Sequence, residues 1–107
     1  MSQPENNNSE EGGTALEIKD FFVDLTGVSD KASLHQRLRE GLPLPSWYGN
    51  NLDALYDALT EMPVPARIHF SAREKAARHL TSYMKGLVRV LADAEKDNPG
   101  LSIIFEE

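Results

Sequence analysis

Three short hydrophobic runs are spaced along the chain, and the segments between them carry hydrophobic residues every three or four positions. The runs are FFVDL at 21–25, ARIHF at 66–70 and LSIIF at 101–105. They are rich in strand-forming residues, which is typical of short β-strands. The first run is almost wholly apolar and ends at Thr26-Gly27, so it predicts a buried strand.

The first and second runs are separated by two helical segments and a loop. Capping residues at 29–33 precede leucines at 34, 38 and 42, which fall on one side of a helix that a glycine and a proline then end. The segment PLPSWYGN at 43–50 has the composition of a loop, and Gly49 is its expected site of positive φ. Asn51 is a good N-cap for a second helix. Its apolar stripe consists of Leu52, Leu55 and Leu59.

Two further helices are expected before the last run. A short helix is indicated near 72–79 and a longer one at 81–97, which Asn98-Pro99-Gly100 ends. One face of the longer helix carries Tyr83, Leu87, Val90, Leu91 and Ala94. Strands that alternate with helices predict an α/β fold, here a small three-stranded parallel sheet packed with three to four helices.

The length and composition of the chain limit its class. A chain of 107 residues forms one domain with a modest core. Residues 1–14 have no apolar side chain after Met1 and are expected to form a disordered acidic tail before a domain at 15–107. No membrane span or signal peptide is evident, so we expect a cytoplasmic protein without membrane contact. The absence of cysteine excludes disulfides and thiol catalysis.

Charge is segregated along the chain. The net charge is −6, and the tail supplies half of it through three glutamates without a base. Residues 40–66 hold four acids and no Lys or Arg, residues 67–89 hold six bases against Glu74, and acids dominate again after residue 89. If the two acidic segments adjoin in space, they form a negative patch that attracts a basic partner and repels nucleic acid.

Two aspartates on the second helix repel each other. Asp53 and Asp57 are four residues apart, so they lie about 40° apart around the helix and destabilise it by a few tenths of a kcal/mol. Tyr56 falls between this pair and the leucine stripe, so its ring is expected at the edge of the core with its hydroxyl outward. An acid at a helix start is also ordinary capping chemistry, so the pair alone leaves a structural and a functional interpretation open.

The long helix also carries acidic residues where they destabilise a helix. Val90, Asp93 and Asp97 form one edge beside its apolar face, and both acids lie near its C-terminus, where the helix dipole disfavours negative charge. Arg89 could pair with Asp93 and neutralise part of this edge. Two helices that both carry destabilising negative charges nevertheless favour a functional acidic surface.

Residues 34–62, LHQRLREGLPLPSWYGNNLDALYDALTEM, resemble the barstar family of intracellular inhibitors of an extracellular bacterial ribonuclease. The shared frame is LHQ-x-L followed by LP-x-x-Y-G-x-N-L-D-A-L-aromatic-D, which is a specific motif. LSIIF is similar to the last strand of that family, so the likeness covers about residues 21–105 and is weakest over 67–83. The resemblance implies a three-stranded parallel sheet with helices packed on it. The family also has a cis proline near the position of Val64-Pro65, and the sequence leaves open whether this bond is cis.

The resemblance also implies which residues contact a partner. In the family, acids of the second helix enter the ribonuclease active site in place of substrate phosphates, and they correspond to Asp53 and Asp57. The aromatic residue between them corresponds to Tyr56, and a ring that packs on the catalytic histidine corresponds to Trp47. Contacts of the late helix fall on Val90, Asp93 and Asp97, and the family has glutamates in place of the two shorter aspartates. The expected partner-binding residues are Trp47, Tyr48, Gly49, Asn51, Asp53, Tyr56, Asp57, Val90, Asp93 and Asp97.

Other functions fit the sequence less well. Paired carboxylates could act as acid and base, but nothing would separate their pKa values on an exposed helix start, so we do not expect an enzyme. His35, His69 and His79 lack metal-ligand spacing, and we expect neither a metal nor a cofactor. The bases at 67–89 are expected to solvate a helix face rather than to bind RNA. One alternative stays open, a monomeric module of the same fold that binds a non-nuclease toxin or a regulatory protein.

Overall fold

The computed structural model describes residues 17–106, and the tail expected at 1–14 lies outside them. The elements are β1 (Lys19–Asp24), α1 (Lys31–Gly41), α2 (Leu52–Thr60), β2 (Ala66–Ser71), α3 (Arg73–Ala77), α4 (Thr81–Asp97) and β3 (Leu101–Glu106). The strands form one parallel sheet in the order β1-β2-β3. The predicted α/β fold, with a three-stranded parallel sheet and four helices, is confirmed.

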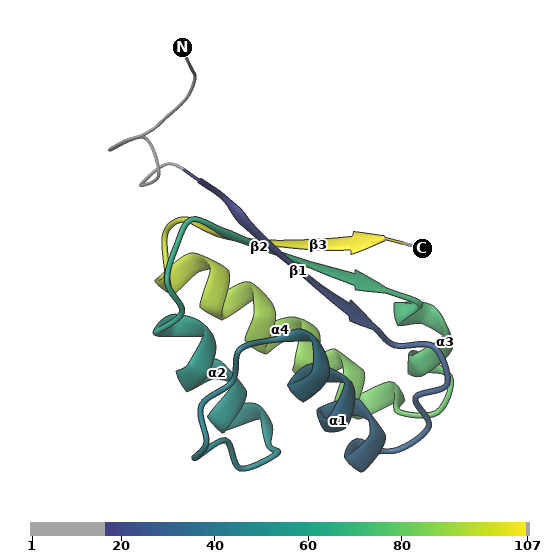
Figure 1. Ribbon diagram of the computed structural model, residues 1–107. Helices are drawn as coiled ribbons and strands as arrows, with labels where there is room; N and C mark the ends of the chain where they lie inside the picture. Colours follow the sequence, from purple (N-terminus) through teal and green to yellow (C-terminus); the bar gives the residue numbers. More distant parts are fainter. Residues whose placement is uncertain (1–16, 107) are drawn as a thin grey trace.

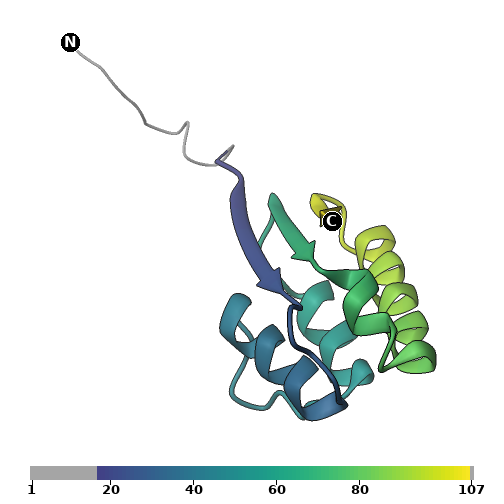
Figure 2. The same cartoon turned by 90° about the vertical axis from the view of Figure 1, so that its right-hand side faces the viewer.

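The molecule has two layers. Helices α1, α2 and α4 lie under one face of the sheet, and α3 follows the end of β2 (Figures 1 and 2). The core lies between the layers, where Ile68 and Phe70 of the central strand are fully buried. Helices α2 and α4 pack closely at Gly86, since a Cβ atom there would lie 3.0 Å from Cδ1 of Leu52.

The opposite face of the sheet carries no helix among the described residues. Phe22 on that face is 64% exposed, and its ring stacks on His69 with 4.6 Å between the centroids. The predicted strand is therefore confirmed, but the prediction that it is buried is wrong for Phe22. Side chains alternate along a strand, so Val23 points into the core and Phe22 points away from it. The continuous apolar run concealed this alternation.

Capping side chains set the starts of α1 and α2 where the sequence predicts them. The amide of Ser33 donates to Oδ1 of Asp30 at 2.8 Å, and the Ser33 hydroxyl accepts from the Asp30 amide, which forms a capping box. The amide of Ala54 donates to Oδ1 of Asn51 at 2.7 Å. Both helices then direct leucines into the core, so the start of α2 is fixed relative to the sheet.

Four local details refine the sequence analysis. The positive φ of the loop falls at Asn50, with φ 57°, and not at Gly49, because asparagine tolerates the left-handed region. Helix α3 has five residues and is shorter than predicted. Helix α4 has the predicted bounds, and Met84 is buried on it although it was not assigned to the apolar face. The Val64-Pro65 bond, which the sequence left open, is cis.

Candidate functional site

The aspartate pair lies on the exposed side of α2. Asp53 is in the first turn and Asp57 one turn later, and both are exposed. Neither carboxylate belongs to an ion pair within residues 17–106. Leu55 and Leu59 on the opposite side of α2 are fully buried. The pair is therefore held on a helix that the core keeps in place.

A hydrogen bond joins α2 to α4 beside this pair. The Tyr56 hydroxyl donates to Oδ2 of Asp97, while the half-buried Tyr56 ring packs against the core. This bond to Asp97, followed by partial burial and by the charges of Asp97, Asp93 and Asp57, raises the pKa of Tyr56. The two acidic segments of the sequence therefore adjoin in space.

The acids of the late helix share this surface. Asp93 and Asp97 are exposed, and Val90 is half-buried on the same edge of α4. Within the described residues Arg89 forms no ion pair with Asp93, so the neutralising pair considered from the sequence does not form. We refer to Asp53, Asp57, Asp93 and Asp97 together as the acidic face.

The loop at 43–51 places an exposed ring beside α2. Trp47 is 53% exposed. It lines a shallow hollow of about 180 Å³ together with Ala58 and Glu61 and with prolines on both sides. Gly49 and Asn51 are exposed, and the side chain of Asn51 is occupied in capping α2. The loop thus combines an accessible aromatic side chain with the start of the acidic helix.

Tyr48 lies deeper than the other residues of the expected set. Its side chain is 3% exposed, and its hydroxyl lies 2.5 Å from Nδ1 of His35. The Tyr83 hydroxyl lies 2.6 Å from Nε2 of the same ring. Burial, and then the charge of Arg39, lowers the pKa of His35, and burial raises the pKa of Tyr48. The Tyr48 ring therefore anchors the loop to the core, and its side chain is not available at the surface.

A second polar cluster lies on the outer face of the sheet. His69 contacts Oδ1 of Asp20 at 2.8 Å through Nε2 and Oε2 of Glu106 at 3.0 Å through Nδ1, and Arg67 also pairs with Asp20. Hydrogen bonds from Arg67 and then His69 lower the pKa of Asp20 to about 2. The bonds to Asp20 and then Glu106 raise the pKa of His69. This cluster is on the other layer of the molecule from the acidic face.

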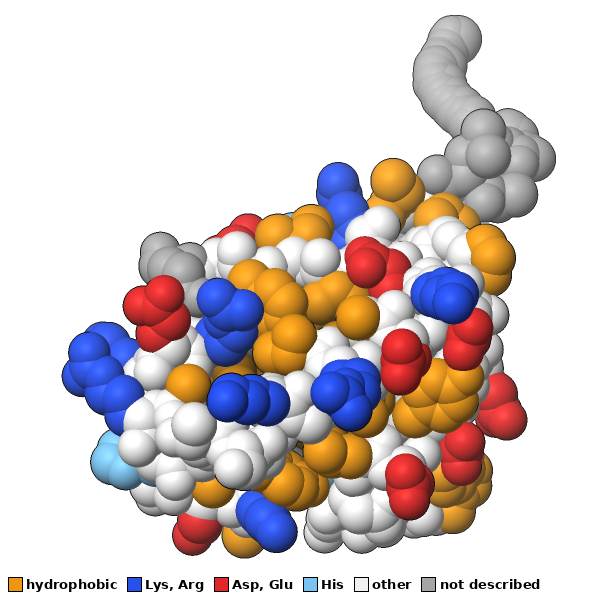
Figure 3. All heavy atoms as spheres, turned by 180° about the vertical axis from the view of Figure 1, so that it is seen from behind, with side chains coloured by type: hydrophobic (Ala, Val, Ile, Leu, Met, Phe, Trp, Pro, Cys, Tyr) orange, Lys and Arg blue, Asp and Glu red, His pale blue; other side chains and the backbone are white. Residues whose placement is uncertain are grey.

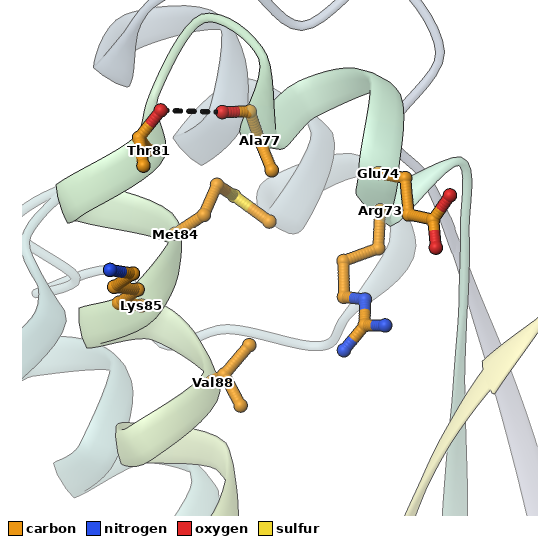
Figure 4. A pocket seen from close by; sticks show the side chains of 7 residues that line it. All are labelled: Arg73, Glu74, Ala77, Thr81, Met84, Lys85 and Val88. Atoms are coloured by element: carbon orange, nitrogen blue, oxygen red, sulfur yellow. Dashed lines mark hydrogen bonds between the residues drawn. The ribbon is translucent and has the colours of Figure 1, made fainter.

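An apolar groove of about 350 Å³ lies between α3 and α4. Met84 and Val88 line it, and Arg73 and Lys85 lie on either side of them (Figure 4). In the view from behind, hydrophobic side chains are bordered by several basic ones (Figure 3). On α4, Met84 and Val88 lie about 140° or more around the axis from Asp93 and Asp97, and Lys85 lies about 80° from Asp93. The groove is therefore separate from the acidic face.

Residues 17–106 contain neither a cluster of metal-binding side chains nor a membrane-spanning helix. No group of three or more His, Asp or Glu side chains there could hold a metal ion. None of the helices in that range has the length and hydropathy needed to cross a bilayer.

Comparison with known families identifies the chain. The family model described as "Barstar (barnase inhibitor)" matches residues 18–105. The chain belongs to the barstar family. A relative from Bacillus subtilis (strain 168), "Putative ribonuclease inhibitor YrdF", is 34% identical over 81 residues, which cover 75% of this chain and 89% of the relative. The resemblance recognised in residues 34–62 is confirmed.

Two supports of the loop in this barstar-family fold were not predicted from the sequence. His35 contacts Tyr48 from inside the core, and Arg39 donates to the loop from outside. Both stand on α1, nine or more residues before the groups they contact. A helical projection places His35 near the buried side of α1, and this is the one sequence signal for its contact with Tyr48. Arg39 is exposed, so the hydrophobic periodicity of α1 does not predict its contact with the loop.

Proposed function

We propose that the protein inhibits a basic ribonuclease by inserting the acidic face into its active site. The carboxylates would take the positions of RNA phosphates. The observation that supports this most is the hydrogen bond from Tyr56 to Asp97, because it holds the acids of α2 and α4 on one surface. In the part of the chain that the structure describes, no acid of this face is neutralised by Lys or Arg. The negative charge is thus available to a cationic partner.

The chemistry of a ribonuclease cleft complements such a surface. A cleft that holds phosphates is lined by Arg, Lys and His, which form strong charge-assisted hydrogen bonds with carboxylates. Carboxylates on a rigid helix offer the same charge as RNA but no bond that the enzyme can cleave. The repulsion between Asp53 and Asp57 is relieved when cations lie between them, so the free protein is destabilised relative to the complex.

Aromatic rings at the edge of the acidic face would add contact area. Trp47 is exposed and Tyr56 half-buried, and these residue types are enriched where binding energy concentrates. Tyr48 would contribute through its backbone and by anchoring the loop. Under this proposal the protein acts without turnover, as a monomer in the cytoplasm, and forms a one-to-one complex.

The direct test is an inhibition titration of guanyl-specific microbial ribonucleases with the purified protein. We expect activity to fall linearly and to vanish at one equivalent. The matched control is the double variant Asp53→Asn/Asp57→Asn, which keeps shape and helix length but removes charge. If the protein inhibits no ribonuclease of the panel at micromolar concentration, a non-nuclease partner is favoured. RNA cleavage by the isolated protein would indicate an enzyme.

A further inference from the structure

Arg39 contacts the loop at 43–51 from outside the core. From the last turn of α1, its Nη2 donates to the carbonyl oxygen of Tyr48 at 2.7 Å, and its Nε donates to Oδ1 of Asn50 at 2.8 Å. The guanidinium carbon also lies 5.1 Å from the centroid of the Tyr48 ring. One planar side chain thus contacts the backbone, a ring and a side chain of the same loop.

These contacts fall on the part of the loop that contains the residue with positive φ. Asn50 is a non-glycine residue with a φ of 57°, a conformation that asparagine tolerates and that its surroundings select. The segment joins α1 to α2 (Figure 1). Arg39 binds the carbonyl of Tyr48, whose neighbours in the sequence are Trp47 and Gly49. Below the loop, the Tyr48 hydroxyl is fixed by His35. The loop is therefore fixed from both sides between Trp47 and the start of α2.

We propose that Arg39 is a positioning residue for partner binding, which holds the loop so that Trp47 and the acidic face are presented together. This inference rests on the proposed function, because it concerns the same surface. Arg39 needs no contact with the partner for this role. Its two donors and its stacked plane select one loop conformation, and a rigid loop loses less conformational entropy when it binds.

The charge of Arg39 and its contacts with the loop predict opposite effects of its removal on binding to a basic partner. Residues 40–66 contain no Lys or Arg, so Arg39 is a cation at the border of an acidic segment. If Arg39 acted only through its charge, its removal would strengthen attraction to a basic partner and speed association. If it holds the loop, its removal speeds dissociation. The two roles can therefore be separated by the kinetics of the complex.

The experiment compares Arg39→Met with Arg37→Met. Both substitutions remove one positive charge from α1, but Arg37 donates to the carbonyl of Asp24 and does not contact the loop. Arg39→Lys is the second variant, since it keeps the charge and loses the paired donors. The loop is followed in the uncomplexed protein by fluorescence anisotropy and acrylamide quenching of Trp47, the only tryptophan in the chain. Dissociation is measured by stopped-flow with the ribonuclease that the titration identifies.

We expect Arg39→Met to lower Trp47 anisotropy, to raise quenching and to speed dissociation about tenfold, whereas Arg37→Met changes none of these. Arg39→Lys should lie near Arg39→Met. Unchanged Trp47 signals in both Arg39 variants, or equal dissociation rates for Arg39→Met and Arg37→Met, would overturn the proposal. If no ribonuclease binds the wild type, the proposed function fails, while the fluorescence of the uncomplexed variants still decides whether Arg39 fixes the loop. Should Arg39→Met not fold, Arg39→Lys provides the same comparison.

Discussion

Asp57 has an exposed carboxylate one turn after Asp53, and it forms no ion pair within residues 17–106. We predict that Asp57→Ala weakens ribonuclease binding about thirtyfold, since truncation of a residue that concentrates binding energy costs about 2 kcal/mol or more. Stability should not fall, because the substitution removes a repulsion of a few tenths of a kcal/mol and introduces a good helix former.

Isothermal titration calorimetry and urea unfolding measure the two effects of Asp57→Ala separately. Glu74→Ala is a suitable control, because it removes an exposed acid on α3 that borders the groove and is not part of the acidic face. A variant with intact affinity would exclude Asp57 from the contact. A variant with a much lower free energy of unfolding would instead give the carboxylate a structural role.

Two histidines make opposite contributions to the pH dependence of stability. Burial lowers the pKa of His35, so the unfolded chain binds this proton more readily, and stability from His35 is lost as the pH falls below about 6.5. Hydrogen bonds to Asp20 and Glu106 raise the pKa of His69. Its contribution is present below about pH 6.5 and is lost as the pH rises through the folded-state pKa. In the wild type the two trends partly cancel.

The substitution His69→Gln should expose the contribution of His35. We predict that the free energy of unfolding of this variant rises more steeply between pH 5 and 8 (a range of about three units around the histidine pKa) than that of the wild type. Urea unfolding at closely spaced pH values measures the slope. His79→Gln is the control for the loss of a histidine, since His79 is exposed on a short turn after α3 and the hydrogen bonds to Asp20 and Glu106 come from His69. If the free energy of unfolding changes with pH in the same way for the wild type and for His69→Gln, the contribution assigned to His69 is wrong.

The end of α1 depends on a close approach between a helix and a strand. A Cβ atom at Gly41 would lie 2.3 Å from the carbonyl oxygen of Phe22, which the backbone of β1 cannot move to accommodate easily. We predict that Gly41→Ala lowers the free energy of unfolding by about 1–3 kcal/mol, the usual effect of overpacking. Chemical denaturation checks the value. Gly49→Ala is the matched control, because its added methyl would meet only the Asn51 amide at 3.2 Å, and it should change stability little.

Most elements could be predicted from local signals. The capping residues Asp30 and Asn51, the leucine stripes and the Asn98-Pro99-Gly100 break are all contained in short stretches of sequence. The exposed Phe22 could not be predicted, because two adjacent phenylalanines conceal which one faces the core. The positive φ at Asn50 also could not, since the contact with Arg39 crosses eleven positions of the chain. Local patterns thus define the elements, whereas contacts between elements determine the details of the loop.

The acidic face and the bases around the groove lie on different sides of the molecule. The acidic face lies on α2 and the adjoining edge of α4, whereas bases border the groove between α3 and α4 (Figure 3). We predict that association with a basic ribonuclease slows at least about tenfold between about 0.01 M and about 1 M salt, because the Debye length shrinks from about 30 Å to about 3 Å. Stopped-flow fluorescence of Trp47 measures this rate.

The groove side supplies the control for this salt effect. Lys85→Gln changes the net charge by one unit at the groove and should alter the association rate by less than about twofold at 0.1 M salt. An association rate that does not depend on salt would mean that shape, not charge, guides the encounter. The sequence indicated the sign of the acidic segments, but their adjacency required the packing of α2 against α4.

The face of the sheet that no helix of residues 17–106 covers offers a point for attaching the molecule to a support. Ser102 is exposed on β3, next to Ile103, which points toward the helical layer, and the chain contains no cysteine. Ser102→Cys would therefore introduce a single thiol on the layer opposite α2. Coupling to a sensor chip or a dye through this sulfur would orient every copy alike, with Trp47 and the four aspartates turned toward the solution.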